Sequence, residues 1–337
     1  MPIRHQAGDF FVCDILDALP KDDLATMEHP VFSLATKPDL RILSYGHNGV
    51  DITVTPSVRG LATIHDKDIL IYCISQLMAA LNAGRSISRN LTLRAHDLLV
   101  ATNRETSGDA YRRLREAFER LAGTRITTNL AMEGQGGDGV EITRGFGLID
   151  SWEIARKTRG GRMISVSVTL SDWLYRAVMS SSVLTLSRDY FRLRKPLERR
   201  IYELARKHCG RQDSWRISVD TLLKKSGSAS PRRVFRAMLR DMIVADHLPD
   251  YTMSEDPGDI IRFTNRAQVL EAGQGPLLPP LASATHDAAR IAAPGWDIYA
   301  LEADWRAYWA ASGRPRLRSA DLAYLGYVRA RMGQGAN

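Results

Sequence analysis

The chain has 337 residues, 44% of them hydrophobic and 25% charged, the composition of an ordinary globular protein with room for two domains and appendages. Its three cysteines form no CxxC pair, which argues against a zinc ribbon or a disulfide scaffold and favours a reducing compartment. No apolar run approaches the roughly 20 residues of a membrane span, and no signal peptide is visible, so we expect a cytoplasmic protein without membrane contact.

The positive charge of the chain is unevenly placed. The net charge is +8, yet residues 1–60 hold 5 basic and 8 acidic side chains, whereas residues 185–266 hold 18 basic and 11 acidic ones. A charge excess that gathers on one module indicates a polyanionic partner more strongly than a diffuse excess does.

The N-terminal part is predicted to hold a hairpin and a long helix. Residues 1–28 are acidic and weakly periodic, with one short helix expected. Strands at 42–43 and 51–55 flank a turn that contains the Asn48-Gly49 pair, a good hairpin signal. Residues 66–83 carry acidic side chains in their first turn and precede a glycine, which predicts a helix.

A helical pair and a small sheet follow. Residues 90–93 are extended, a small helix holds Leu98 and Leu99, and a second helix covers 108–122. A small antiparallel sheet is then expected from three segments that alternate or are β-branched, namely 124–129, 141–143 and 163–169.

The turn RKTRGGR at 156–162 places four cations at the tip of a hairpin. In a winged-helix domain such a tip lies against the phosphate backbone of DNA. A tip that only improves solubility is an equally good interpretation of the turn alone.

Residues 195–246 predict a long amphipathic helix, a short helix and an arginine-rich third helix. This order is the scaffold of a helix-turn-helix domain. Ser230 is expected as the N-cap of the third helix and Pro231 as its first residue. Two faces are expected on this helix: a core face of Val234, Met238 and Met242, and a cationic stripe of Arg232, Arg236 and Arg240 with Arg233 beside it. After it, IIRFTNR (260–266) predicts a second, smaller hairpin.

The two halves of the chain are alike. A shift of 124 positions without gaps sets Leu98-Leu99 on Leu222-Leu223 and Arg112 on Arg236, and it matches apolar positions in both helical pairs. We interpret the likeness as two tandem winged-helix (helix-turn-helix) domains of common ancestry in an α+β fold.

The C-terminal region is predicted as a linker and a helical tail. Residues 267–295 are rich in Ala, Pro, Gly and Leu, as linkers are, and 296–337 hold two helices with three tryptophans, too few residues for a core of their own. The expected divisions are an acidic segment with a hairpin, a first and a second winged-helix domain, a linker and a tail: 1–60, 61–180, 181–266, 267–295 and 296–337.

No catalytic constellation is recognisable. The literal GxGxxG of Gly134, Gly136 and Gly139 lies between predicted strands and follows no βα unit, so a hairpin loop is expected there. The sequence has no GxxxxGK[ST] motif, no HxH pair and no HExxH motif. We therefore expect no cofactor, no metal and no enzymatic activity.

Long motifs between residues 29 and 265 carry a family resemblance. They include HPVFSLATKPD (29–39), GLATIHDKDILIYCISQLMAALN (60–82), GDAYRRLREAFERLAGTRITTN (108–129) and LTLSRDYFRLRKPLERRIYELARKHCGR (184–211). These motifs resemble the plasmid replication initiator protein A family of Gram-negative, mainly alphaproteobacterial, plasmids. The resemblance implies a protein that binds repeated double-stranded DNA sites at an origin, helps to open the duplex and assists the loading of host replication proteins. It also implies a possible homodimer that represses its own gene.

The candidate DNA contacts follow from these expectations. Arginines at the start of the third helix would read guanine edges, while serines and lysines nearby would hold phosphates. The second-module candidates are Lys224, Lys225, Ser228, Ser230, Arg232, Arg233 and Arg236. The first-module candidates are Ser107, Arg112, Arg113, Arg156, Lys157, Arg159 and Arg162. A transcriptional repressor or partition factor would use the same helices, and an origin-nicking enzyme with a tyrosine nucleophile is the alternative from another class.

Overall fold

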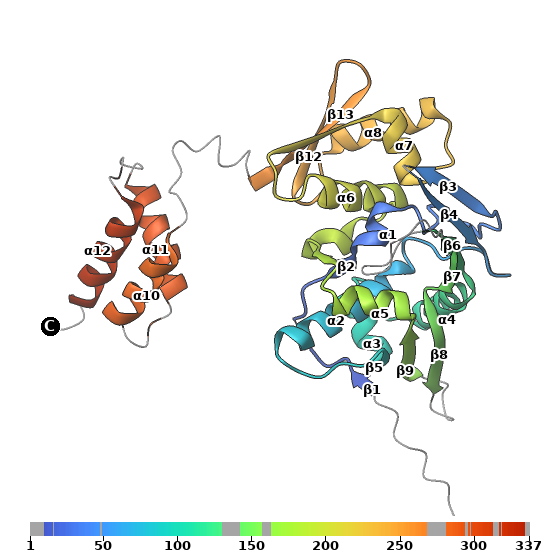
Figure 1. Cartoon of the computed structure of the whole chain (residues 1–337), viewed down its shortest axis with the longest axis horizontal. Helices are drawn as coiled ribbons and strands as arrows, with labels where there is room; N and C mark the ends of the chain where they lie inside the picture. The colour runs from blue at the N-terminus through green and yellow to red at the C-terminus, as the bar shows by residue number, and fades with distance from the viewer. Residues whose placement is uncertain are drawn as a thin grey trace, which may run out of the picture. The chain divides into compact units, whose positions relative to one another are not determined.

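The computed structural model describes residues 10–15, 17–47, 49–129, 142–156, 163–267, 281–293, 296, 298–312, 317 and 319–333. The chain forms two compact units, Met1–Asn265 and Arg266–Asn337 (Figure 1). The fold is mixed α and β, as predicted.

The first half of the large unit is built around α2 (Lys67–Asn82), a helix with buried residues on every side. A strand, two helices, a hairpin and a further helix follow it, namely β5 (Asn90–Leu93), α3 (Ala95–Ala101), α4 (Gly108–Gly123), β8 (Ile149–Arg156) with β9 (Met163–Leu170), and α5 (Asp172–Met179). With β1 (Phe10–Val12) the strands form a sheet in the order β1-β5-β9-β8. The short β1 is parallel to β5, and the other pairs are antiparallel.

The second half repeats this order of elements. It enters through β10 (Val183–Thr185) and a 3₁₀ turn, η1 (Arg188–Arg192). The repeated elements are α6 (Pro196–His208), β11 (Ser214–Ser218), α7 (Val219–Ser226), α8 (Arg232–Ala245), β12 (Tyr251–Asp256) and β13 (Ile260–Asn265). Its strands form an antiparallel sheet in the order β11-β13-β12, which corresponds to β5-β9-β8 in the first half.

The N-terminal segment contributes to both halves. Strand β2 (Lys21–Asp23) pairs with β10 and runs into α1 (Leu24–Glu28), which contacts α6. The predicted hairpin is present as β3 (Leu43–His47) and β4 (Val50–Thr55), and Gly49 in its turn has a φ of +76°. That left-handed conformation favours glycine.

The prediction of one sheet from 124–129, 141–143 and 163–169 is wrong. Strand β6 (Arg125–Thr128) pairs with β4 and with β7 (Arg144–Gly147) in the sheet β3-β4-β6-β7, whereas β9 belongs to the sheet of β5. Of the segment 141–143, residues 142 and 143 are not in a strand. Alternation along a segment indicates a strand but carries no information about its partner, and these partners lie far away in the chain.

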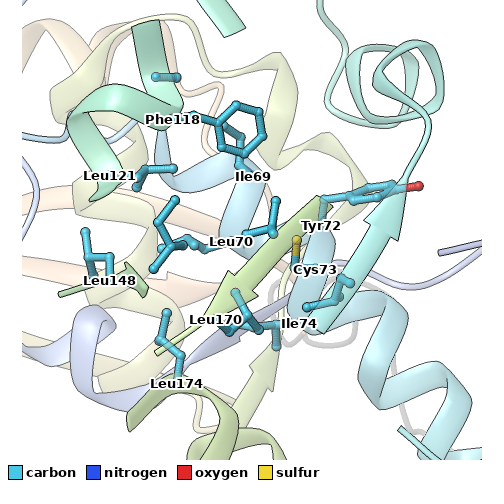
Figure 2. Close-up of a cluster of buried hydrophobic side chains, with 14 of the residues drawn as sticks. Ile69, Leu70, Tyr72, Cys73, Ile74, Phe118, Leu121, Leu148, Leu170 and Leu174 are labelled. Atoms are coloured by element: carbon cyan, nitrogen blue, oxygen red, sulfur yellow. The ribbon is translucent and has the colours of Figure 1, made fainter. Parts of the chain in front are cut away.

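The described residues of the large unit form two hydrophobic cores. Figure 2 shows part of the first, where Ile69, Leu70 and Ile74 of α2 lie near Phe118 of α4 and Leu170 of β9. Cys73 belongs to the same core. The second core gathers apolar side chains from α6, α7, α8 and the sheet of the second half, among them Ile201, Leu222, Phe235, Leu239 and Phe263.

Helix α8 differs from the prediction in its first residue and in its buried face. It begins at Arg232, so Pro231 precedes the helix, and no side chain caps it. The prediction that Val234 faces the core is wrong, because its side chain is exposed. The buried residues are Phe235, Leu239 and Met242, and Met238 is half-buried.

The shift that matches the two halves therefore differs along the chain: it is 124 positions for the first strand and helix and 125 for the second helix. The first strand and helix keep the shift of 124, since buried Leu93 and Leu98 match buried Ile217 and Leu222. On the second helix the buried positions match 125 residues apart, as in Ala110 with Phe235 and Leu114 with Leu239. Arg112 and Arg236, which a shift of 124 pairs, consequently lie on different faces of their helices.

The C-terminal unit has a core of its own. Its helices are α10 (Ser283–Ala292), α11 (Ile298–Ala311) and α12 (Ala320–Gly333), and its buried residues include Ala289, Leu301, Trp305, Tyr324 and Val328. Helix α10 lies inside the segment predicted as a linker, so that prediction is wrong for residues 283–292. Alanine favours both linkers and helices, and here two neighbouring helices cover the apolar side of α10.

Candidate nucleic-acid interface

The cationic side chains that the sequence places on α8 are held by carboxylates. Arg232 contacts Asp220, and its Nη2 lies 2.6 Å from Oδ2 of Asp259. Arg236 contacts the same Asp259 oxygen. One turn further along α8, Arg240 pairs with Glu255 of β12 at 2.8 Å. The stripe is thus a row of ion pairs between α8 and two neighbouring elements.

Arg233 differs from its neighbours on α8. Its side chain is exposed and makes no ion pair with the residues that the structure describes. It is therefore the arginine at the start of α8 that an anion reaches without displacing a carboxylate.

The backbone fixes the carboxylate that two of these arginines share. Asp259 lies in the turn between β12 and β13, where Gly258 and Asp259 both have positive φ angles, +83° and +57°. The carbonyl oxygen of Asp259 accepts a hydrogen bond of 2.9 Å from the backbone N–H of Val219, the first residue of α7. This bond joins the hairpin turn to the start of α7.

The side chains predicted to hold phosphates near the turn before α8 differ in their exposure and in their contacts. Lys224 is exposed at the end of α7. Lys225 is half-buried and contacts Glu28, so a phosphate reaches it only by displacing that carboxylate. Ser228 and Ser230 bond within the turn, because the backbone N–H of Ser230 donates to Oγ of Ser228 at 3.3 Å.

Glu28, which the sequence did not single out, is the centre of this cluster. Besides Lys225, it lies 3.2 Å from Nζ of Lys207 and 3.0 Å from Nε2 of His208. Burial raises the pKa of Glu28, but the hydrogen bonds from His208 and Lys225 and the nearby charge of Lys207 outweigh it, and the pKa is well below its usual range. The end of α1 therefore carries a carboxylate that stays ionised.

Arg200 of α6 ties the same corner together through backbone oxygens. Its Nη1 donates to the carbonyl of Met27 at 2.9 Å, and its Nη2 donates to those of Lys225 at 2.8 Å and Glu28 at 3.1 Å. One guanidinium thus satisfies carbonyl groups at the ends of both α1 and α7, which helices leave unpaired.

The turn before α8 rests on the N-terminal segment. Gly227 has a φ of +70°, and a Cβ there would lie 2.6 Å from Cβ of Pro30 and 3.0 Å from the hydroxyl of Tyr45. A cleft of about 410 Å³, with Tyr45 and Lys224 in its lining, separates this turn from β3 and β4. Another of about 630 Å³, which Arg41 and Ser230 help to line, lies between the turn, the loop 33–43 and α6.

The first-module candidates on α4 make their contacts within the helix or with Glu105, three residues before its first residue. Ser107 caps α4 by accepting from the N–H of Ala110 at 3.4 Å. Arg112 contacts Asp109 and lies 3.1 Å from Glu116, while Arg113 lies 2.8 Å from Asp109 and 3.7 Å from Glu105. Both arginines remain more than half exposed.

The basic hairpin turn lies at the margin of the described residues. Arg156 ends β8, but its side chain is outside the described part. The other candidates of the turn, Lys157, Arg159 and Arg162, lie outside the described residues altogether.

A buried ionic network joins the two halves of the large unit. Lys67 of α2 is fully buried and lies 2.6 Å from Asp22 and 3.0 Å from Glu203 of α6. Asp68 of α2 contacts Arg199 of α6, also buried. Burial raises the pKa of Asp22 against the opposing charge of Lys67. Oppositely charged side chains from three chain segments therefore lie together in the interior of the large unit.

The described residues contain neither a membrane-spanning helix nor a cluster of metal-binding side chains. None of their helices combines the length and the apolar character that a membrane crossing needs. Nor does this part of the chain gather three or more His, Cys, Asp or Glu side chains into a possible metal site.

Comparisons with known proteins show which proteins the chain is similar to. A protein of Wigglesworthia glossinidia brevipalpis named "Putative replication protein" is 38% identical over 262 residues, which cover 77% of this chain and 94% of that protein. A crystal structure of domains 2 and 3 of RctB is similar with a TM-score of 0.51 at 13% identity, covering 71% of this chain and 94% of the other. At that identity the likeness concerns the fold alone.

The sequence model of a protein family, described as Replication initiator protein A, matches residues 21–253. That range includes the first half, the buried network and most of the second half, which continues beyond it to the end of β13. With the match over most of its length and a relative of 38% identity, the chain belongs to the replication initiator protein A family.

Proposed function

We propose that the chain starts plasmid replication by binding repeated double-stranded DNA sites at the origin, opening the duplex and helping to load host replication proteins. It acts by binding and catalyses no reaction. Membership of an initiator family supports the first part of this proposal, and the order of the structural elements supports the mode of binding.

One observation carries the mode of binding. Each half of the large unit has a strand, two helices and a hairpin, with matching sheet orders β5-β9-β8 and β11-β13-β12. That is the arrangement of a winged helix, in which the second helix enters the major groove and the hairpin lies beside it. Helices α4 and α8 are then the two recognition helices, and the hairpins β8–β9 and β12–β13 are the wings.

The side chains divide the work between bases and phosphates. Arg232, Arg233 and Arg236, near the start of α8, reach base edges, where arginine binds guanine O6 and N7. Lys224 and the backbone of the turn at 227–231 hold phosphates. On the first module Arg112, Arg113 and the basic turn at 156–162 hold the backbone of a neighbouring segment of DNA.

The same surface also fits a repressor of the chain's own gene, bound as a homodimer. The two functions differ in the DNA that they require. An initiator protects several tandem repeats in the same orientation, while a dimeric repressor protects one palindrome whose half-sites match its two-fold symmetry.

Footprinting of the DNA that flanks the gene tests the proposal. We expect protection of several tandem repeats by the full chain at moderate salt. Protection of a single palindrome assigns the chain to repression instead. If the protein protects no part of this DNA while it retards any fragment equally, sequence-specific binding is refuted.

A second assay on the same DNA tests the absence of catalysis. A supercoiled plasmid that carries the repeats should stay closed after incubation with the protein and divalent cations. A site-specific nick with protein attached through a tyrosine would establish an origin-nicking enzyme and overturn this part of the proposal.

A further inference from the structure

The cationic stripe that the sequence predicts on α8 is matched by carboxylates in the structure. Three arginines of α8 face three carboxylates, one at the start of α7 and two in the hairpin β12–β13: Arg232, Arg236 and Arg240 against Asp220, Asp259 and Glu255. A face built only to hold phosphates gains nothing from these acids, because each of them repels the DNA backbone.

Asp259 has the central place among the three acids. It contacts two arginines, Arg232 and Arg236, one helical turn apart on α8. Its own position is set by the backbone, since its carbonyl oxygen accepts from Val219 at 2.9 Å and its φ is +57°. A carboxylate held in this way fixes the direction of both guanidinium groups before any ligand arrives.

We propose that Asp259, assisted by Asp220, determines the specificity of the second module by holding Arg232 and Arg236 for base reading and away from indiscriminate phosphate binding. The inference rests on the function proposed above, and it names how the same surface separates the right DNA sequence from the wrong one.

The donors that remain on the guanidinium groups suit this role. Each group has five N–H donors in a fixed plane. The carboxylates engage Nε and Nη2 of Arg232 and Nη2 of Arg236. Nη1 of both arginines keeps its donors among the described residues, and it can bind a neutral base edge while the ion pairs stay intact. A phosphate competes directly with the carboxylates, so random DNA gains little from these side chains.

Substitution of Asp259 by Asn separates charge from shape. Asparagine has nearly the same volume and is among the few residues that tolerate a positive φ, so the turn should keep its conformation. Loss of the carboxylate frees up to two guanidinium groups for phosphates. Asp220→Asn removes the second partner of Arg232 from a separate element, α7, and serves as an independent variant.

The test measures the affinity of full-length parent and variant proteins for two DNA fragments of equal length. One carries the footprinted repeats, and the other has the repeats scrambled. For Asp259→Asn we expect scrambled DNA to bind roughly three- to tenfold more tightly and the plot of log K against log salt to steepen by about 1. The ratio of specific to scrambled affinity should fall about tenfold.

Asp241→Asn is the matched control, because Asp241 lies on α8, is exposed and forms no ion pair with the described residues. It removes the same charge from the same module and should leave the ratio of affinities unchanged. Equal loss of specificity in Asp241→Asn would show an effect of net charge alone and overturn the inference.

Two other outcomes are informative. If Asp259→Asn and Asp220→Asn both keep the parent's ratio and salt slope, the carboxylates only brace the hairpin and the inference is wrong, while the proposed function stands. A parent protein that does not distinguish the two fragments would instead refute the proposed function.

Discussion

The two matching helices, α4 and α8, hold their arginines in different ways. On α4 the partners of Arg112 and Arg113 are carboxylates of the same helix or just before it, and all of these side chains are more than a third exposed. Such local pairs at exposed positions contribute little to stability and rearrange easily. On α8 the partners lie on α7 and on the hairpin, so the guanidinium groups have a direction set by the tertiary structure.

The hairpins differ in the same sense. The turn of the second hairpin holds Asp256 and Asp259 around Pro257-Gly258, whereas the turn of the first reads RKTRGGR. On the proposed function, the acidic turn orients arginines and the basic turn holds phosphates. One topology would then support base reading in one module and backbone binding in the other, and the following predictions test that division.

The largest effect is expected on the free energy of unfolding, at the buried ion pairs that join the two modules. Lys67→Met leaves the buried carboxylates of Asp22 and Glu203 without their cation, which should lower the free energy of unfolding by about 3–5 kcal/mol. Urea denaturation measures it. The pKa of Asp22, already raised by burial, rises further in the variant. Because the folded state then binds a proton more tightly than the unfolded one, the loss should shrink as the pH falls.

Arg89→Met is the control for this prediction. Arg89 pairs with Asp150 at 2.9 Å, but both side chains are more than 40% exposed, so the loss should stay below about 1 kcal/mol. Equal losses in the two variants would mean that the network does not join the modules, and the comparison would then describe two independent domains.

An intermediate effect is expected on DNA binding, and it should differ between substitutions on α4 and on α8. Arg236→Ala should weaken binding to the repeats by about 1–3 kcal/mol and relax the preference at one base position. Arg112→Ala on α4 should weaken all sequences alike. Binding to a panel of single-base variants of the repeat measures both. If Arg236→Ala binds every site as well as the parent does, α8 is not the reading helix.

The smallest effect is expected at the basic turn of the first hairpin. Lys157→Ala should weaken binding to all sequences equally and reduce the slope of log K against log salt by about 1. Arg192→Ala in η1 is the control, since this exposed arginine pairs with Asp189 at 2.9 Å and should leave the slope unchanged. An unaltered slope in Lys157→Ala would remove the turn from the interface.

Much of the fold could be predicted from local patterns. The helix over Lys67–Asn82, the pair α3 and α4, and the hairpin β3–β4 follow from periodicity, acidic first turns and the Asn48-Gly49 turn. These signals lie within one element or its turn. The family was also recognisable, because long motifs of the chain match it.

What could not be predicted depends on contacts between distant segments. Glu28 and Lys225 are 197 positions apart in the chain, and nothing in either neighbourhood indicates the other. Similarly, the buried face of α8 was ambiguous because Val234 and Phe235 are adjacent apolar residues, and only packing decides which of them is covered. The sequence therefore predicts arginines on α8 without the carboxylates that hold them.

The buried network has a consequence for exchanging parts between relatives. Lys67 and Asp68 come from one half, Arg199 and Glu203 from the other, and Asp22 from the segment before both. A chimera that joins the first half of one family member to the second half of another inherits only some of these charges. Recombination at the boundary near residue 180 should therefore yield folded hybrids only when the parents share the whole set, so the two halves are expected to be inherited together.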